Sequence, residues 1–179
     1  MRADGPRHGR PLRPAVFFDR DGVINADLGY VGDPSRFVLL PGAAAGVRAA
    51  SAAGALTFLV TNQSGVARGF YTEDDVAALH RHMAGLLAGE GAHFDDMRTC
   101  PHLPDAPLAA YRRDCACRKP GPGMIVDLMA AWPVDPARSA MIGDKPSDVA
   151  AARAAGIRGL LYTGGPLEAA VARALAGEG

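Results

Sequence analysis

Short apolar runs alternate along the chain with longer stretches whose apolar residues recur at helical spacing. Five of the short runs have the length and composition of buried β-strands. They are residues 15–18 (AVFF), 56–60 (LTFLV), 94–100 (FDDMRTC), 140–143 (AMIG) and 159–163 (GLLYT). These runs predict the strands of a sheet.

A helix is predicted over residues 72–91, TEDDVAALHRHMAGLLAGEG. Thr72 is a suitable N-cap, and Asp75 three positions later supports that start. The apolar residues of this stretch fall on one helical face, which is expected to pack into the core. They are Val76, Leu79, Met83, Leu86 and Leu87.

Two further stretches read as helices. Residues 120–132 (PGPGMIVDLMAAW) carry Pro122 near the first turn, where proline is well tolerated. Residues 147–156 (SDVAAARAAG) run from Ser147, the predicted N-cap, to Gly156 as the stop. Alternation of strand and helix predicts an α/β domain with one doubly wound, mainly parallel sheet, and ligands at the carboxyl ends of its strands.

The chain is expected to form one domain over residues 15–179, preceded by a flexible, Arg-, Gly- and Pro-rich tail at residues 1–14. The formal net charge is zero, which argues against nucleic acid as the main partner but allows a small anionic ligand. No apolar run is long enough to span a bilayer, and no secretion signal is visible. We therefore expect a cytoplasmic protein without membrane contact, and, because no apolar helix face is left over, a monomer.

Polar side chains follow the first predicted strand in the sequence DRDGVIN. Asp19 and Asp21 are two positions apart, and Gly22 lets the chain turn so that both carboxylates reach one cleft. A short Asp-Gly sequence is also common in an Asx turn that only caps a loop. This motif alone leaves both interpretations open.

Two other strand ends carry polar groups. TNQSG follows the second strand, and DKPSD, with Asp144, Lys145 and Asp148, follows the strand at residues 140–143. Acids at a helix start can also serve only the helix dipole. Together, the three strand ends supply the carboxylates, hydroxyls and lysine that hold magnesium and a phosphate in one crevice.

All three cysteines lie in one segment, CPHLPDAPLAAYRRDCACRKP. Cys100-x-His102 and Cys115-x-Cys117 provide the three thiolates and one imidazole that structural zinc favours, and four protein ligands leave no position for water. The alternative is three free thiols and a surface histidine. The sequence predicts a structural zinc site that organises this loop. The other histidines, His80 among them, are expected on the surface or on a helix face.

The motifs DRDGVINADLGYV, VTNQSGVARG, CPH to CACRKPGPGM and IGDKPSD occur in this order. In order and spacing they resemble the haloacid dehalogenase superfamily of aspartate-dependent phosphatases, and within it the heptose bisphosphate phosphatases. The resemblance extends over nearly the whole chain from Ala15. It implies a Rossmann-like core without a cap domain, because both intervals in which relatives insert a cap are short here.

The resemblance also implies catalytic roles. Asp19 would be the nucleophile that forms an aspartyl-phosphate, and Asp21 the general acid and base. Thr61 and Lys119 would hold the phosphoryl oxygens, and Lys119 would also hold Asp19 in place.

Magnesium is implied between the Asp19 carboxylate, the Asp21 backbone carbonyl and Asp144, with Asp148 in support. Arg118 suits a second phosphate because a guanidinium can bind it in a bidentate fork. The implied substrate-binding residues are Asp27, Leu28, Gly29, Tyr30, Thr61, Asn62, Gln63, Ser64, Arg118, Lys119 and Lys145.

The implied activity is magnesium-dependent removal of the C7 phosphate of D-glycero-D-manno-heptose 1,7-bisphosphate, in the biosynthesis of nucleotide-activated heptose for lipopolysaccharide. Two alternatives stay open. One is a histidinol-phosphate phosphatase, and the other is a catalytically silent, zinc-stabilised module that binds a sugar phosphate. The presence of both Asp19 and Asp21 favours an enzyme.

Overall fold

The computed structural model describes residues 11–177, which contain a five-stranded sheet of order β3-β2-β1-β4-β5 with every neighbouring pair parallel. The strands are β1 (Ala15–Phe18), β2 (Leu56–Asn62), β3 (Asp96–Cys100), β4 (Ala140–Gly143) and β5 (Arg158–Leu161). The chain starts in the middle of the sheet, builds outward to β3, and returns to add β4 and β5. This confirms the doubly wound α/β fold and places its topological switch point between β1 and β4.

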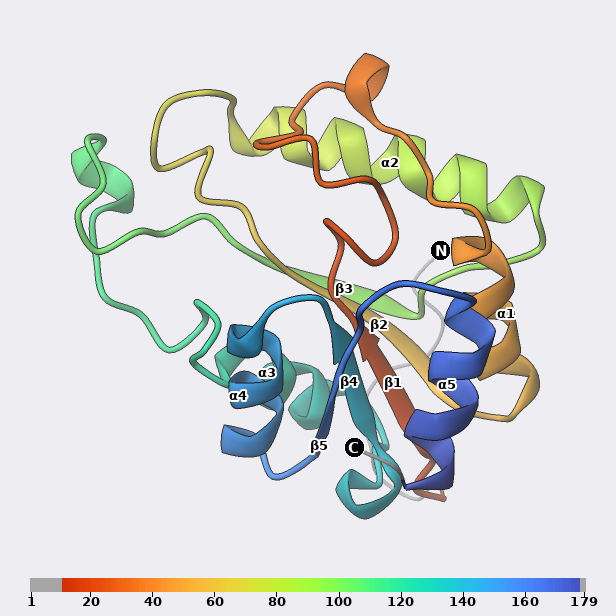
Figure 1. Ribbon diagram of the computed structural model, residues 1–179. Coiled ribbons are helices and arrows are strands. Elements are labelled where there is room, and N and C mark those ends of the chain that lie inside the picture. The colour runs from red at the N-terminus through yellow and green to blue at the C-terminus, as the bar shows by residue number, and fades with distance from the viewer. Residues whose placement is uncertain (1–10, 178–179) are drawn as a thin grey trace.

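Helices cover both faces of the sheet (Figure 1). They are α1 (Ala43–Ala52), α2 (Glu73–Gly89), α3 (Gly123–Ala131), α4 (Pro146–Ala154) and α5 (Leu167–Ala176). Val16 and Phe18 of β1 share a core with α1, α2 and α5, whereas Ala15 and Phe17 share one with α3 and α4. Because apolar residues pack on both faces of the sheet, polar site residues are expected at the strand ends.

The five predicted strands are confirmed, with shifts at their ends. The second strand runs two residues beyond the apolar run at 56–60, because Thr61 and Asn62 still pair with Thr99 and Cys100 of β3. That extension carries two predicted site residues to the carboxyl edge of the sheet as part of a rigid strand.

The start of α2 is confirmed as a capping box. The Asp75 backbone N–H donates to Thr72 Oγ1 at 3.1 Å, and the Thr72 N–H donates to Asp75 Oδ2 at 2.8 Å. The predicted buried face is wrong at one position, since Leu86 is 38% exposed while His80 is only 8% exposed. The buried stripe therefore runs through His80 and leaves Leu86 at its margin.

The predicted N-cap at Ser147 is wrong. Helix α4 begins at Pro146, and the N-cap is Lys145, whose backbone N–H donates to Asp148 Oδ2 at 3.0 Å. Proline fits the first helical position because its ring presets φ and it needs no partner for an N–H.

The tail predicted at residues 1–14 lies outside the described residues for its first ten positions. At its end, the Arg13 N–H donates to the Pro133 carbonyl at 2.8 Å, and the Pro14 carbonyl accepts from the Leu56 N–H at 2.8 Å. The segment directly before β1 is thus already bonded to the domain. Among residues 11–177, no helix combines the length and the hydropathy that a membrane crossing requires.

Candidate active site and metal centre

Asp19 comes directly after β1 and is 5% exposed. Its backbone N–H donates to the Ile142 carbonyl of β4 at 3.0 Å, so the residue is still held at the switch point between β1 and β4. Its Oδ1 accepts from the Arg20 N–H at 2.8 Å and lies 2.8 Å from Lys119 Nζ. The carboxylate is therefore fixed in place at the edge where this fold binds ligands.

Lys119 is buried and links several of these groups. Its Nζ donates to the Val60 carbonyl at 2.9 Å and lies 2.8 Å from Asp19 Oδ1 and 2.7 Å from Asp148 Oδ1. The Asn62 amide holds the Lys119 backbone on both sides, accepting from its N–H and donating to its carbonyl, each at 3.0 Å. Two carboxylates compensate the buried ammonium, and Asn62 is engaged in positioning it.

Asp21 is held by three side chains that all donate hydrogen bonds. Arg20 Nη2 lies 3.0 Å from Oδ1 and 3.1 Å from Oδ2, and Asn25 Nδ2 donates to Oδ1 at 2.9 Å. Gln63 Nε2 donates to Oδ2 at 3.0 Å and also to Thr61 Oγ1 at 2.9 Å. Gln63 thus links two of the predicted catalytic residues.

A set of carboxylates that fits a divalent cation lies beside these groups. One oxygen each of Asp19, Asp144 and Asp148 lies within 4.8 Å of the others. Gly22 has φ +83°, and a Cβ there would lie 2.3 Å from Asp144 Oδ2, so a side chain would push Asp144 away. Among the described residues, the buried Oδ1 of Asp144 has no hydrogen-bond partner. Hard cations such as magnesium take oxygen ligands of this kind.

Two carboxylates of this set, Asp19 and Asp144, are harder to ionise than usual. Burial raises the pKa of Asp19 to about 6, although Lys119 opposes the shift. Burial also raises the pKa of Asp144. A bound cation would favour the ionised forms of both groups.

The predicted substrate loop at residues 27–30 lies at the surface. Asp27 Oδ2 accepts from Lys145 Nζ at 3.1 Å, and Asp27 Oδ1 accepts from the Gly29 N–H at 3.1 Å. Burial alone would raise the pKa of Asp27, but the hydrogen bonds from Lys145 and Gly29 lower it. Leu28 and Tyr30 are about half exposed. Two predicted substrate residues, Asp27 and Lys145, are therefore paired with each other.

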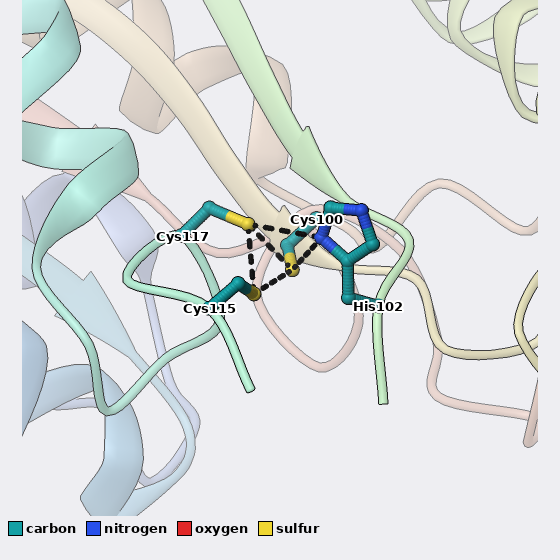
Figure 2. Close-up of side chains that lie close together, drawn as sticks. All are labelled: Cys100, His102, Cys115 and Cys117. Atoms are coloured by element: carbon teal, nitrogen blue, oxygen red, sulfur yellow. Dashed lines mark hydrogen bonds between the residues drawn. The ribbon is translucent and has the colours of Figure 1, made fainter. Parts of the chain in front are cut away.

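The four predicted zinc ligands come together (Figure 2). Sulfur–sulfur distances among Cys100, Cys115 and Cys117 are 3.0 to 3.6 Å, and His102 Nδ1 lies 3.3 Å from Cys117 Sγ and 3.7 Å from Cys100 Sγ. One metal ion can reach all four atoms in tetrahedral geometry. Burial raises the pKa of the Cys100 thiol, so binding a metal would displace its proton.

Two further predicted residues are half-buried and held by backbone contacts. Arg118 Nη1 donates to the carbonyl of His102 at 3.2 Å, which ties the guanidinium to a predicted zinc ligand. The Ser64 carbonyl accepts from the Arg68 N–H at 3.0 Å in the turn after β2.

Three residues around Asp21 were not predicted. Arg20 is fully buried, and sequence gives no sign of this because arginine is usually exposed. Asn25 lies inside the DRDGVIN motif, so its position could have drawn attention to it. The Tyr71 hydroxyl donates to Gln63 Oε1 at 2.8 Å, a contact that only the fold reveals.

Comparisons with known proteins identify relatives of this chain. The family model described as HAD-hydrolase-like (haloacid dehalogenase) matches residues 116–178. The chain is 54% identical over 165 residues, 92% of each sequence, to the D-glycero-beta-D-manno-heptose-1,7-bisphosphate 7-phosphatase of Rhodopseudomonas palustris.

Two solved structures are also similar. A putative HAD-like phosphatase from Mesorhizobium loti matches with a TM-score of 0.82 and 33% identity, over 96% of this chain and 90% of that one. The D,D-heptose 1,7-bisphosphate phosphatase of B. bronchiseptica, complexed with magnesium and phosphate, matches with a TM-score of 0.76 and 35% identity, over 89% and 86%. The chain therefore belongs to the heptose-1,7-bisphosphate 7-phosphatase family of the haloacid dehalogenase superfamily.

Proposed function

We propose that this protein is a magnesium-dependent phosphatase that removes the phosphate at C7 of D-glycero-D-manno-heptose 1,7-bisphosphate, a step toward nucleotide-activated heptose. The relative from R. palustris is named for this activity, and the related B. bronchiseptica structure carries magnesium and phosphate. The observation that carries the proposal is the buried Asp19–Lys119 pair next to a fully hydrogen-bonded Asp21.

In the first step, a carboxylate oxygen of Asp19 bonds to phosphorus while the bond from phosphorus to the C7 oxygen breaks. Asp21 gives a proton to that oxygen, so the sugar leaves as an alcohol. Lys119 and Thr61 hold the phosphoryl oxygens, and the Lys119 charge stabilises the negative charge that accumulates on them.

In the second step, Asp21 takes a proton from a water molecule whose oxygen attacks phosphorus. The bond from phosphorus to Asp19 breaks, which frees inorganic phosphate and restores the Asp19 carboxylate. Asp21 then carries the proton that it donates in the next cycle. The donors around Asp21 hold its carboxyl group in one position for both steps.

Asp19, Asp144 and the Asp21 backbone carbonyl would hold magnesium, and Asp148 would support them through Lys119. Magnesium, when bound, neutralises negative charge on the nucleophile and the phosphoryl group. Zinc would be held by the three cysteines and His102, and with four protein ligands its role would be structural.

The second phosphate would be bound by Arg118, and the sugar by the loop at residues 27–30 and Lys145. Preference for the beta anomer is supported by the name of the R. palustris relative. A cytoplasmic location is supported by the need for reduced cysteines. A monomer is proposed because, among the helices of residues 11–177, the exposed large apolar side chains are limited to Leu86 of α2 and Val126 of α3.

Release of inorganic phosphate tests the proposal. The zinc-loaded protein is incubated with both anomers of the heptose bisphosphate and with histidinol phosphate, with and without magnesium. We expect turnover of the bisphosphate, faster for the beta anomer, that requires magnesium. Faster turnover of histidinol phosphate would contradict the substrate, and no turnover of any compound would contradict the enzyme.

A further inference from the structure

The orientation of the Gln63 amide decides which group faces Asp21. Nε2 donates to Asp21 Oδ2 and Thr61 Oγ1, while Oε1 accepts from the Tyr71 hydroxyl at 2.8 Å. An amide turned by half a rotation would bring its oxygen against Asp21, where it would repel the ionised carboxylate or accept a hydrogen bond from the proton that Asp21 must give to the leaving oxygen. A hydrogen bond from Tyr71 that fixes Oε1 therefore also keeps Nε2 turned toward Asp21.

The Tyr71 ring is held in a slot between two buried glycines. A Cβ at Gly32 would lie 2.2 Å from the ring Cδ1, and a Cβ at Gly65 would lie 2.2 Å from the ring Cζ. Burial raises the pKa of Tyr71 to about 12, so the hydroxyl keeps its proton at neutral pH. The two glycines thus leave room for the Tyr71 ring. Its protonated hydroxyl can donate to Gln63 Oε1.

We propose that Tyr71 is a positioning residue for Asp21 and acts through the Gln63 amide. The side chains form a relay from the Tyr71 hydroxyl to Gln63 Oε1 and from Gln63 Nε2 to Asp21. Phenylalanine at position 71 would keep the ring in its slot but leave Oε1 without its donor. The amide could then turn, and Asp21 would lose one of the three side chains that hold it.

This inference rests on the proposed function, in which Asp21 gives its proton to the departing oxygen. An error in the placement of Asp21 should therefore slow the release of a leaving group that needs this proton. A sugar alkoxide needs it, whereas 4-nitrophenolate is stable enough to leave with little protonation. The ratio of the two activities separates a positioning role from a general loss of folded enzyme.

The experiment compares kcat/KM of the wild type and Tyr71→Phe on the heptose bisphosphate and on 4-nitrophenyl phosphate, with magnesium present. This parameter covers the steps up to departure of the leaving group. We expect a loss of about tenfold on the heptose bisphosphate, a part of the usual contribution of acid–base catalysis, and less than about a twofold change on 4-nitrophenyl phosphate. The ratio is unaffected by any fraction of unfolded protein.

Two further variants make the test specific. Tyr162→Phe removes a hydroxyl that donates to the Gly165 carbonyl after β5, and it should leave both activities unchanged. In a Gln63→Leu background, Tyr71→Phe should have no further effect, because residues of one relay are not additive.

Equal losses on both substrates, or full additivity with Gln63→Leu, would overturn the relay. The activity of the wild type distinguishes failure of the relay from failure of the proposed function. If it hydrolyses another sugar phosphate in place of the heptose bisphosphate, the proposed substrate fails and the same ratio is measured on that compound. A wild type that hydrolyses no phosphate ester overturns both proposals.

Discussion

At Asp19, burial and a neighbouring positive charge shift the pKa of the carboxyl group in opposite directions. The carboxylate is almost fully buried, which raises its pKa, while the Lys119 ammonium 2.8 Å away lowers it. Lys119 also contacts Asp148, so the two acids share one positive charge. A divalent cation bound beside Asp19 would favour its ionised form.

Replacing Asp19 by asparagine should abolish turnover and leave the fold intact. The amide has the same size but cannot attack phosphorus, so kcat should fall at least about a thousandfold. Lys119 keeps Asp148 as a partner, which should preserve the melting temperature. Phosphate release and thermal unfolding measure the two effects, with the exposed Asp105→Asn as control. Turnover near the wild-type rate would exclude Asp19 as the nucleophile.

His80 should make stability depend on pH. Burial, with Arg20 nearby, lowers its pKa from 6.5 to about 4, while Asp21 opposes the shift. The unfolded chain therefore binds the proton more tightly, and stability is lost as the pH falls from about 6.5 to about 4, by about 3 kcal/mol at most.

The free energy of unfolding, measured by urea titration across this pH range, tests the His80 prediction. The loss in wild type should exceed the loss in His80→Gln, whereas the exposed His82→Gln on the same helix should behave as wild type. An identical pH dependence in His80→Gln and wild type would show that His80 is not the group responsible.

The segment between β3 and α3 joins the predicted zinc site to the chemistry. The last two of its predicted metal ligands, Cys115 and Cys117, lead directly into Arg118 and Lys119. Arg118 also donates to the His102 carbonyl, which ties the loop to the two cations that we propose bind phosphate. Metal bound here would determine where these cations lie without contacting the substrate.

Cys117→Ser should lose zinc and stability together. At free zinc a thousandfold above its dissociation constant, the lost stabilisation is about 4 kcal/mol. Metal analysis and chemical unfolding measure both quantities, and Ala116→Ser, in the same loop, is the control. A variant that keeps one zinc per chain and unfolds like wild type would contradict a structural site.

The apolar runs predicted the central strands β1, β2 and β4 well, because these strands are buried on both faces, whereas the edge strands β3 and β5 are only partly buried. Helices α1 and α5 were not predicted, since alanine dominates both and gives a weak contrast between apolar and polar positions. The end of β2 could not be predicted either. Its last two residues are polar, and only pairing with β3 keeps them in the strand.

In the site, strand ends and motif resemblance identified Asp19, Asp21, Lys119 and Asp144, which the fold brings to one edge. The sequence could not predict which side chain hydrogen-bonds to each of these residues. Asn62 and Gln63 were expected to bind substrate, but their amides hold Lys119 and Asp21. Such contacts join segments far apart in the chain, and no local pattern encodes them.

Residues 11–177 form a sheet with helices on both faces, and the polar groups of the candidate site gather at the carboxyl ends of β1, β2 and β4. Within residues 11–177, no separate cap folds over this edge (Figure 1). We therefore propose that the loop at residues 27–30 and the loop between β3 and α3 select the substrate. In the proposed mechanism, these loops would bind the sugar and the second phosphate, which would orient the C7 phosphate toward Asp19.

The position of the phosphate that is removed tests this account most directly. Phosphorus NMR can follow D-glycero-beta-D-manno-heptose 1,7-bisphosphate during turnover by the magnesium-loaded protein. The account predicts loss of the C7 phosphate signal, growth of inorganic phosphate and a C1 phosphate that stays on the sugar. Release of the C1 phosphate first, or no release from this compound, would contradict it.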